Sequence, residues 1–252
     1  MAETPILLLT RPRAQSERFA ASLEGALAAL PRVIAPLIEI VPLPLPLDPG
    51  PFATFIFTSE NGVASFAAQS PLRDRPAWCV GPRTAAAAAE AGFAVRSAEE
   101  EGGNAEALIG MLRAARPATP LLHLRGAHAV TDLAGRLRAE GLACDEAVVY
   151  AQQDCPPTPG ALDVLSGPVP VLVPLFSPRS ARLVAEAVGR MRQAGPVAPL
   201  HAVAISDAAA DRWRSGGAGE DARVVVAERP DARGMIEALG RLCRELEGGL
   251  RT

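Results

Sequence analysis

The sequence predicts an α/β protein of two lobes, each a parallel β-sheet with helices on both faces. Short β-like runs alternate with helical patterns along nearly the whole chain, and such alternation is typical of parallel sheets. The chain is also weakly similar to itself, which favours two lobes of one plan over a single long sheet. A length of 252 residues suits one large domain or two of about 120 residues.

The composition narrows the classes of protein to consider. Hydrophobic residues make up 49% and aromatic residues 4%, so a substantial core must consist of Leu, Val, Ile and Ala. A net charge of -3 gives no reason to expect nucleic acid as a partner, since nucleic-acid-binding domains are usually basic. Every basic side chain apart from histidine is arginine. The absence of lysine excludes a P-loop lysine and a Schiff-base lysine.

Neither cysteines nor histidines indicate a cofactor. The four cysteines form no C-x-x-C pair, and the three histidines lack the spacing of metal ligands. We therefore expect no metal and no other cofactor. The first residues do not combine a basic n-region with an apolar h-region, and no apolar run approaches ~20 residues, so neither a signal peptide nor a membrane span is expected. A cytoplasmic protein without membrane contact is expected.

The first elements follow from the order of apolar residues. The apolar run Ile6–Thr10 predicts a strand. Two β-like stretches, 33–34 and 37–41, come before a proline-rich connector over 42–51. Between the first strand and these stretches, a helix is predicted by apolar residues at spacings of three or four: Phe19, Leu23, Leu27 and Leu30.

The same alternation continues to the end of the chain. Segments 90–93 and 139–142 each contain a glycine that follows an alanine-rich or charged run. Such a glycine can adopt the left-handed conformation, which predicts the end of a helix at each place. Strands are predicted at 54–57, 77–80, 121–124, 147–150, 169–173, 201–205 and 223–226. Helices are predicted at 62–69, 84–91, 105–115, 127–140, 178–192, 208–214 and 232–246.

The internal similarity concerns segments in which a strand ends and a helix begins. Residues 56–63 are similar to 174–181, and residues 8–11 are similar to 122–125. Ligands of open α/β sheets bind outside the carboxyl ends of the strands. Backbone N–H groups at the starts of helices, with the helix dipole behind them, can bind carboxylates there. The candidates at these ends are Arg11, Thr58, Ser59, Gly81, Thr84, Arg125, Ser177 and Ser206.

Two candidates have an equally acceptable structural role. Ser177 followed by Pro178 is typical of a helix N-cap, which contributes about 1 kcal/mol without any ligand. Tyr150, the single tyrosine, ends the β-like segment 146–150, where a packing role is common. Its place on a strand that returns from the second lobe to the first gives it functional weight. Motifs for dinucleotides, serine hydrolases and zinc proteases are absent.

At these residues the sequence resembles the uroporphyrinogen-III synthase (HemD) family. The likeness is carried by an ordered set of motifs over nearly the whole chain. Two departures are Phe176, where the family has threonine before serine, and Ala208 with Ala209, where the family has threonines. The matching segments are Thr10–Pro12, Phe57–Val63, Val80–Ala85, Leu124–Gly126, Val148–Tyr150 and Ser177–Ala181.

The resemblance implies an architecture. Two α/β lobes with HemD-like, flavodoxin-like topology would be joined by a two-stranded β hinge, with both termini in the first, discontinuous lobe. Carried over, lobe one is 1–36 and 155–252, and lobe two is 48–145. The hinge strands are 37–47 and 146–154.

The resemblance also implies a function. Family members cyclise hydroxymethylbilane to uroporphyrinogen III, with loss of water and inversion of ring D, in the biosynthesis of heme, chlorophyll and corrins. This lyase reaction needs no cofactor, because electron-rich pyrroles supply the reactivity. Tyr150 would donate a hydrogen bond to the leaving hydroxyl. Substrate would be bound by Arg11, Thr58, Ser59, Asn61, Gly62, Gly81, Thr84, Arg125, Ser177, Ser180 and Ser206.

The partners expected are the substrate and, transiently, hydroxymethylbilane synthase, with the protein a monomer. The main alternative is a non-catalytic, two-lobed protein that binds a small anion, since it would have the same fold and the same helix starts. A Rossmann-type nucleotide enzyme is disfavoured by the missing glycine fingerprint.

Overall fold

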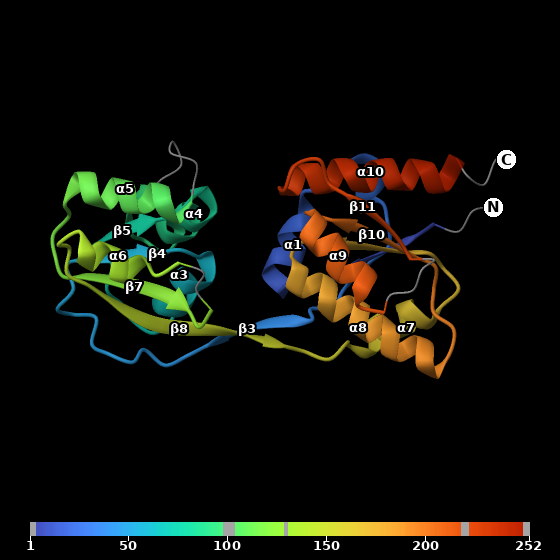
Figure 1. Ribbon diagram of the computed structural model, residues 1–252, viewed down its shortest axis with the longest axis horizontal. Helices are drawn as coiled ribbons and strands as arrows, with labels where there is room; N and C mark the ends of the chain where they lie inside the picture. The colour runs from blue at the N-terminus through green and yellow to red at the C-terminus, as the bar shows by residue number, and fades with distance from the viewer. Residues whose placement is uncertain (1–3, 98–103, 129–130, 218–221, 249–252) are drawn as a thin grey trace. The chain divides into compact units, whose positions relative to one another are not determined.

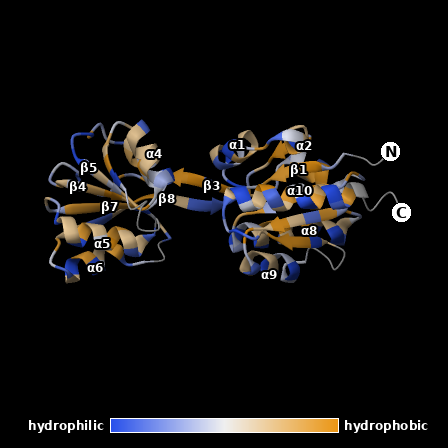
Figure 2. Ribbon diagram, turned by 90° about the horizontal axis from the view of Figure 1, so that it is seen from above, coloured by the Kyte–Doolittle hydropathy of each residue, from blue (hydrophilic) through white to orange (hydrophobic). Residues whose placement is uncertain are grey.

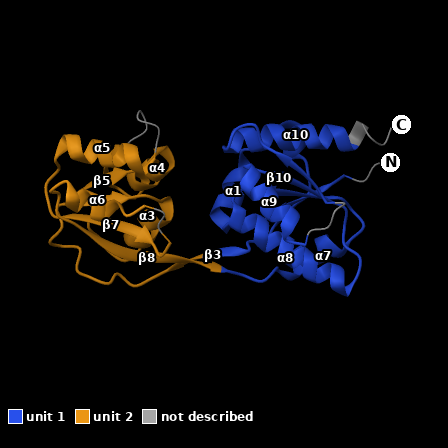
Figure 3. Cartoon of the chain, in the orientation of Figure 1, with its two compact units in different colours: residues 1–39, 154–252 blue, residues 40–153 orange. Residues whose placement is uncertain are grey.

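The computed structural model describes residues 4–97, 104–128, 131–217 and 222–248 (Figure 1). The chain divides into two compact units, coloured separately in Figure 3. Unit 1 contains residues 1–39 and 154–252, and unit 2 contains residues 40–153. Both units are α/β with a mostly parallel sheet, which confirms the predicted fold class.

Unit 1 has a five-stranded parallel sheet. Its order is β11-β10-β9-β1-β2, with each neighbouring pair parallel. Numbered along the chain, this is the order 2-1-3-4-5 of flavodoxin-like folds. The strands are β1 (Ile6–Leu9), β2 (Arg32–Ile34), β9 (Val171–Leu175), β10 (Leu200–Ala204) and β11 (Arg223–Val226).

Helices cover both faces of this sheet. Trp213 and Val184 belong to the core on one face, and Phe19 and Leu239 to the core on the other. Figure 2 shows hydrophobic and hydrophilic residues around α10, as expected of a helix with one buried face. The helices are α1 (Arg13–Ala21), α2 (Gly25–Ala28), α7 (Pro159–Ser166), α8 (Pro178–Ala194), α9 (Asp207–Ser215) and α10 (Ala232–Gly248).

Unit 2 has a six-stranded sheet of order β3-β8-β7-β4-β5-β6. The five strands from β8 to β6 are parallel, and along the chain their order is 3-2-1-4-5. The strands are β3 (Ile38–Pro42), β4 (Thr54–Phe57), β5 (Pro76–Cys79), β6 (Ala94–Ser97), β7 (Leu121–Gly126) and β8 (Cys144–Asp154).

The helices of unit 2 also enclose two core layers. Phe55 packs edge to face on both Phe66 and Phe93 in the layer beneath α3 and α4. Ile56 and Leu112 belong to the opposite layer, beneath α5 and α6. The bounds are α3 (Glu60–Ala67), α4 (Pro82–Glu90), α5 (Ala105–Ala115) and α6 (Leu133–Ala139).

The chain passes between the two units in β3 and again in β8. The amide of Cys155 donates to the carbonyl of Leu37, and the amide of Leu43 donates to the carbonyl of Val149, both at 2.9 Å. From Leu37 to Leu43 the bonded partner moves back from Cys155 to Val149, so the two strands run antiparallel. β3 ends at Pro42, and residues 43–53 form neither helix nor strand.

Most predicted elements are present, and the helix ends at Gly92 and Gly141 are confirmed by φ angles of 91° and 79°. Two elements were not predicted, β6 and α7. The predicted helix over 127–140 was too long: α6 begins after Asp132, whose carboxylate accepts from the amide of Gly135. Part of that prediction, 129–130, lies outside the described residues. No helix in the described ranges has the length and apolar character needed to cross a membrane.

Candidate functional site

Each sheet has one point where the order of its strands reverses. This point lies between β1 and β9 in unit 1, and between β4 and β7 in unit 2. Ligands of open α/β sheets bind at the carboxyl ends of such strands. In each unit an arginine (Arg11, Arg125) stands at the end of one of these strands, and a serine that caps a helix (Ser177, Ser59) follows the other. The two units therefore share a local arrangement, although the order of its parts along the chain is reversed.

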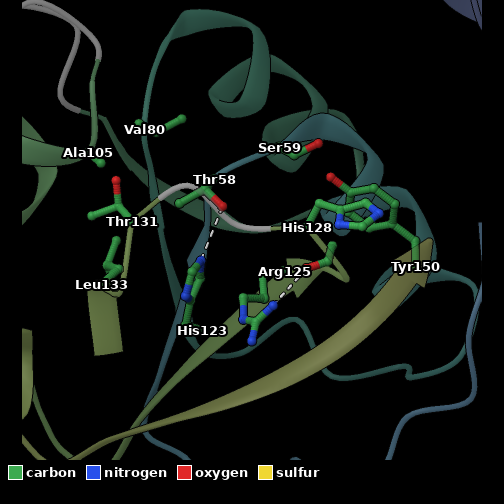
Figure 4. Close-up of a pocket in the computed structure, with 11 residues that line it drawn as sticks. Thr58, Ser59, Val80, Ala105, His123, Arg125, His128, Thr131, Leu133 and Tyr150 are labelled. Atoms are coloured by element: carbon green, nitrogen blue, oxygen red, sulfur yellow. Dashed lines mark hydrogen bonds between the residues drawn. The ribbon is translucent and has the colours of Figure 1, made fainter. Parts of the chain in front are cut away.

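A pocket of about 260 Å³ lies at this point in unit 2 (Figure 4). Four of the predicted site residues line it together: Thr58, Ser59, Arg125 and Tyr150. Its wall thus combines two hydroxyl side chains, a guanidinium and a phenol. The full lining is Thr58, Ser59, Val80, Ala105, His123, Arg125, Gly126, His128, Thr131, Leu133 and Tyr150.

Tyr150 is positioned by an irregularity in the pairing of β7 with β8. Arg125 pairs with Val148, but Gly126 pairs with Tyr150, so β8 contains one extra residue at this place. Such bulges redirect side chains and are common near active sites. Tyr150 belongs to the core beneath α3 and α4, and the residue as a whole is 8% exposed. Tyr150 therefore has a packing role and still reaches the pocket.

A buried histidine stands behind Thr58. His123 is in the middle of β7 with 1% of its surface exposed. Its Nε2 lies 3.1 Å from Oγ1 of Thr58, and its Nδ1 lies 3.4 Å from Oε1 of Glu146. The second contact does not have the alignment of a hydrogen bond, so we treat it as electrostatic. These contacts connect the pocket wall to a carboxylate on β8.

The charges around His123 balance one another. Oε2 of Glu146 accepts from Nη2 of Arg125 at 3.1 Å, and Nη1 of Arg125 donates to the carbonyl of Gly126 at 2.9 Å. Burial lowers the pKa of His123 to about 4, against the opposing effect of Glu146. The imidazole is therefore neutral at pH 7, and the arginine beside the pocket is countered by its own carboxylate.

The start of α3 is largely occupied by its own cap. Oγ of Ser59 accepts from the amide of Asn61, and the carbonyl of Ser59 accepts from the amide of Gly62. A Cβ on Gly62 would lie 2.9 Å from the carbonyl oxygen of Leu124, so glycine permits α3 to approach β7. Asn61 and Gly62 thus serve the position of α3, and neither lines the pocket.

The start of α4 differs because no side chain caps it. Gly81 is the N-cap residue, Pro82 has no amide hydrogen, and Thr84 is buried in the first turn. The amide of Ala85 bonds to the carbonyl of Gly81, which leaves the Thr84 amide without an acceptor within the helix. This helix follows Val80 of the pocket wall and retains a donor for an anion.

In unit 1 the predicted serines all act as helix caps. Ser177 and Ser180 bond reciprocally in a capping box at the start of α8, as the N-cap prediction for Ser177 required. Oγ of Ser206 accepts from the amide of Ala209 at the start of α9. Ala209 is buried in the core of unit 1, whereas Ala208 is exposed.

Arg11 lies over the ring of Phe176, with Cζ 4.2 Å from the ring centroid. Phe19 packs edge to face on the same ring at 4.8 Å. Phe176, which departs from the family's threonine, therefore provides an apolar platform that orients Arg11 at the end of β1.

His123 and Glu146 were not among the predicted site residues. The sequence did contain a signal for His123, which stands between leucines in an otherwise apolar strand. A polar side chain that is buried in such a strand needs a hydrogen-bond partner. The partners of His123 are distant in sequence, so the role of His123 and Glu146 could not be predicted. Among residues 4–97, 104–128, 131–217 and 222–248, no group of three or more His, Cys, Asp or Glu could hold a metal ion.

The known proteins to which this chain is similar are uroporphyrinogen-III synthases. The family model described as uroporphyrinogen-III synthase HemD matches residues 26–237. Uroporphyrinogen-III synthetase from Helicobacter pylori has a TM-score of 0.62 at 22% identity, covering 96% of this chain and 100% of that one. A mutant uroporphyrinogen III synthase from Thermus thermophilus has a TM-score of 0.46 at 15% identity, covering 96% and 99%. A search of curated proteins found no match.

Proposed function

This chain belongs to the uroporphyrinogen-III synthase HemD family, and from that premise we propose that it closes hydroxymethylbilane into uroporphyrinogen III. It is an enzyme of tetrapyrrole biosynthesis. In the proposed reaction the terminal hydroxyl leaves as water, and the far pyrrole attacks through its substituted carbon. The resulting spiro intermediate fragments and recloses with ring D inverted.

The observation that carries the proposal is the position of Tyr150 at the wall of the unit 2 pocket, beside Thr58 and Ser59 (Figure 4). A volume of about 260 Å³ is below the range of about 300 to 1,000 Å³ for pockets that hold a drug-sized ligand. It suits one pyrrole ring rather than the whole linear tetrapyrrole. We assign this ring as the one that bears the hydroxymethyl group.

Tyr150 is the proposed hydrogen-bond donor to the departing hydroxyl. A phenol is neutral and protonated at pH 7, so it can donate without a prior proton transfer. Stabilising charge that develops on the leaving oxygen accelerates its departure. The ring of Tyr150 is fixed by its core packing, which keeps this donor in place during the reaction.

We propose that the carboxylate arms of the substrate bind outside this pocket. In unit 2 the uncapped start of α4, at Gly81 and Thr84, offers amide hydrogen and the positive end of the helix dipole. In unit 1 the proposed contact is the guanidinium of Arg11, held over Phe176. Because Ser177, Ser180 and Ser206 are used as caps, we assign them a supporting role in shaping unit 1.

The experiment is a coupled assay with porphobilinogen and its deaminase, followed by separation of the uroporphyrin isomers. The linear intermediate closes without inversion to isomer I when no synthase acts on it. We expect isomer III in proportion to added protein. Isomer I alone from a well-folded sample would contradict the proposal and would favour a non-catalytic anion-binding protein.

We further propose that the protein acts as a monomer in the cytoplasm and receives substrate in transient contact with hydroxymethylbilane synthase. Sedimentation of the protein alone tests whether it is a monomer, and sedimentation with hydroxymethylbilane synthase during turnover tests the transient contact. A stable dimer would argue against the monomer. A flux to isomer III that resists a substrate trap only when the two enzymes are fused would argue against a transient contact between the separate enzymes.

A further inference from the structure

The contacts of His123 determine which way the hydroxyl of Thr58 points. One ring nitrogen, Nε2, is 3.1 Å from Oγ1 of Thr58, and the other, Nδ1, is 3.4 Å from Oε1 of Glu146. Figure 4 shows the imidazole beneath Thr58, on the side away from Val80. A neutral imidazole carries one hydrogen, so only one of its nitrogens can donate.

The carboxylate of Glu146 selects the tautomer. Its other oxygen, Oε2, accepts a charge-assisted hydrogen bond from Arg125 at 3.1 Å. A bare nitrogen lone pair 3.4 Å from a carboxylate oxygen in a buried site is electrostatically unfavourable, whereas an N–H at that distance is attracted to the carboxylate even without the alignment of a hydrogen bond. The hydrogen therefore resides on Nδ1. Nε2 is then an acceptor, and its partner must be the hydroxyl hydrogen of Thr58.

With its hydrogen used in this way, the hydroxyl of Thr58 has only lone pairs left for the pocket. We propose that His123 is a positioning residue that makes Thr58 a hydrogen-bond acceptor, and that Thr58 accepts from a pyrrole N–H of the bound ring. The identity of this donor rests on the proposed function. The orientation of the hydroxyl does not, because it follows from contacts within unit 2.

The charge balance of the pocket supports a neutral donor as the ligand. Arg125 is countered by Glu146, and the burial that lowers the pKa of His123 keeps that ring uncharged at neutral pH. A carboxylate placed against an oxygen lone pair would be repelled. A pyrrole, in contrast, presents an N–H in its plane and no in-plane lone pair, so it matches an acceptor in a confined, near-neutral site.

The first test measures the tautomer directly and needs no substrate. The chain has three histidines, so nitrogen-15 spectra of its imidazoles are simple, and His123→Gln identifies the signals of His123. At pH 7 we expect a hydrogen on Nδ1 and an unprotonated Nε2. Protonation of Nε2, alone or together with Nδ1, would overturn the inference even in a protein with full activity.

The second test uses steady-state kinetics with hydroxymethylbilane generated in place. Thr58→Val removes the acceptor and should raise KM about fivefold, the effect of one ordinary hydrogen bond, with a smaller change in kcat. His123→Asn keeps a group near the position of Nδ1 but leaves nothing at Nε2, so we expect a similar rise in KM. His123→Gln can place its amide oxygen near the position of Nε2 and should restore a KM close to wild type.

The double variant Thr58→Val with His123→Asn separates positioning from general packing. If His123 acts through Thr58, the double variant should have the KM of Thr58→Val alone. Multiplied effects of the two changes would overturn the proposal. Thermal melting of each variant reports any loss of folding. Production of isomer I alone by wild type would refute the proposed function, whereas the tautomer measurement would still decide the orientation of Thr58.

Discussion

The ring of Tyr150 lies so close to Gly126 that a Cβ on Gly126 would come within 2.6 Å of Cζ and 2.9 Å of the hydroxyl oxygen. Even one methyl group at this position must displace the tyrosine. We expect Gly126→Ala to lower the rate of isomer III formation about tenfold or more. Overpacking of this kind should reduce the free energy of unfolding by about 1 to 3 kcal/mol. The coupled isomer assay and urea unfolding measure the two effects.

A matched control is Gly160→Ala, in the first turn of α7. A Cβ on Gly160 would meet nothing within 4 Å, so the same methyl group is added without a clash. We expect wild-type activity and an unfolding free energy that is unchanged or up to about 1 kcal/mol higher. Full activity in Gly126→Ala would show that turnover does not depend on the position of Tyr150.

Tyr150→Phe tests the hydroxyl apart from the ring. The phenyl group remains in the core beneath α3 and α4, so stability should change little. Loss of the donor should lower kcat about 100-fold, at the low end for a group that assists proton transfer, with little effect on KM. Leu162→Ala, an exposed apolar side chain in unit 1, is the control for a change that should leave kcat intact. An unchanged kcat in Tyr150→Phe would remove the catalytic assignment.

The fold could be predicted because its buried strands are short apolar runs, such as Thr54–Phe57, in which every residue is buried. The strand β6 was missed because Ala94–Ser97 lies at a sheet edge and alternates between exposed and half-buried residues. The helix α7 was not predicted; prolines at 156, 157 and 159 precede or begin it, and Pro159 occupies the first helical position, which proline tolerates.

The site could be predicted in part. Thr58 and Arg125 stand at the ends of β4 and β7, Tyr150 lies within β8, and all three line one pocket. The role of His123 depends on the register between β4 and β7, in which Ile56 pairs with His123. Those strands are separated along the chain by three helices and two strands. Apolar periodicity gives the face of each strand but not its register against a distant partner.

The uncapped start of α4 offers a test of carboxylate binding by backbone amides. The backbone at Gly81 is extended, with φ of -175° and ψ of 177°, which any residue can adopt. In Gly81→Ser the new hydroxyl should accept from the Thr84 amide, raise stability by a few tenths of a kcal/mol and compete with substrate. KM should therefore rise several-fold. Thr84→Ala keeps the amide and should leave KM within about twofold; an unchanged KM in Gly81→Ser would argue against this binding site.

Burial of His123 makes stability depend on pH in a defined direction. The pKa of His123 is lowered from 6.5 to about 4 in the folded chain, so between these values the unfolded chain binds the proton more readily. The associated stability is complete above pH 6.5 and is lost as the pH falls towards 4, by about 3 kcal/mol. His123→Gln lacks this titration, and its unfolding free energy should fall about 3 kcal/mol less between pH 7 and pH 4. Exposed His128→Gln should retain the wild-type slope. Equal slopes for wild type and His123→Gln would mean that His123 is not buried as a neutral ring, and the acceptor role of Thr58 would fail with it.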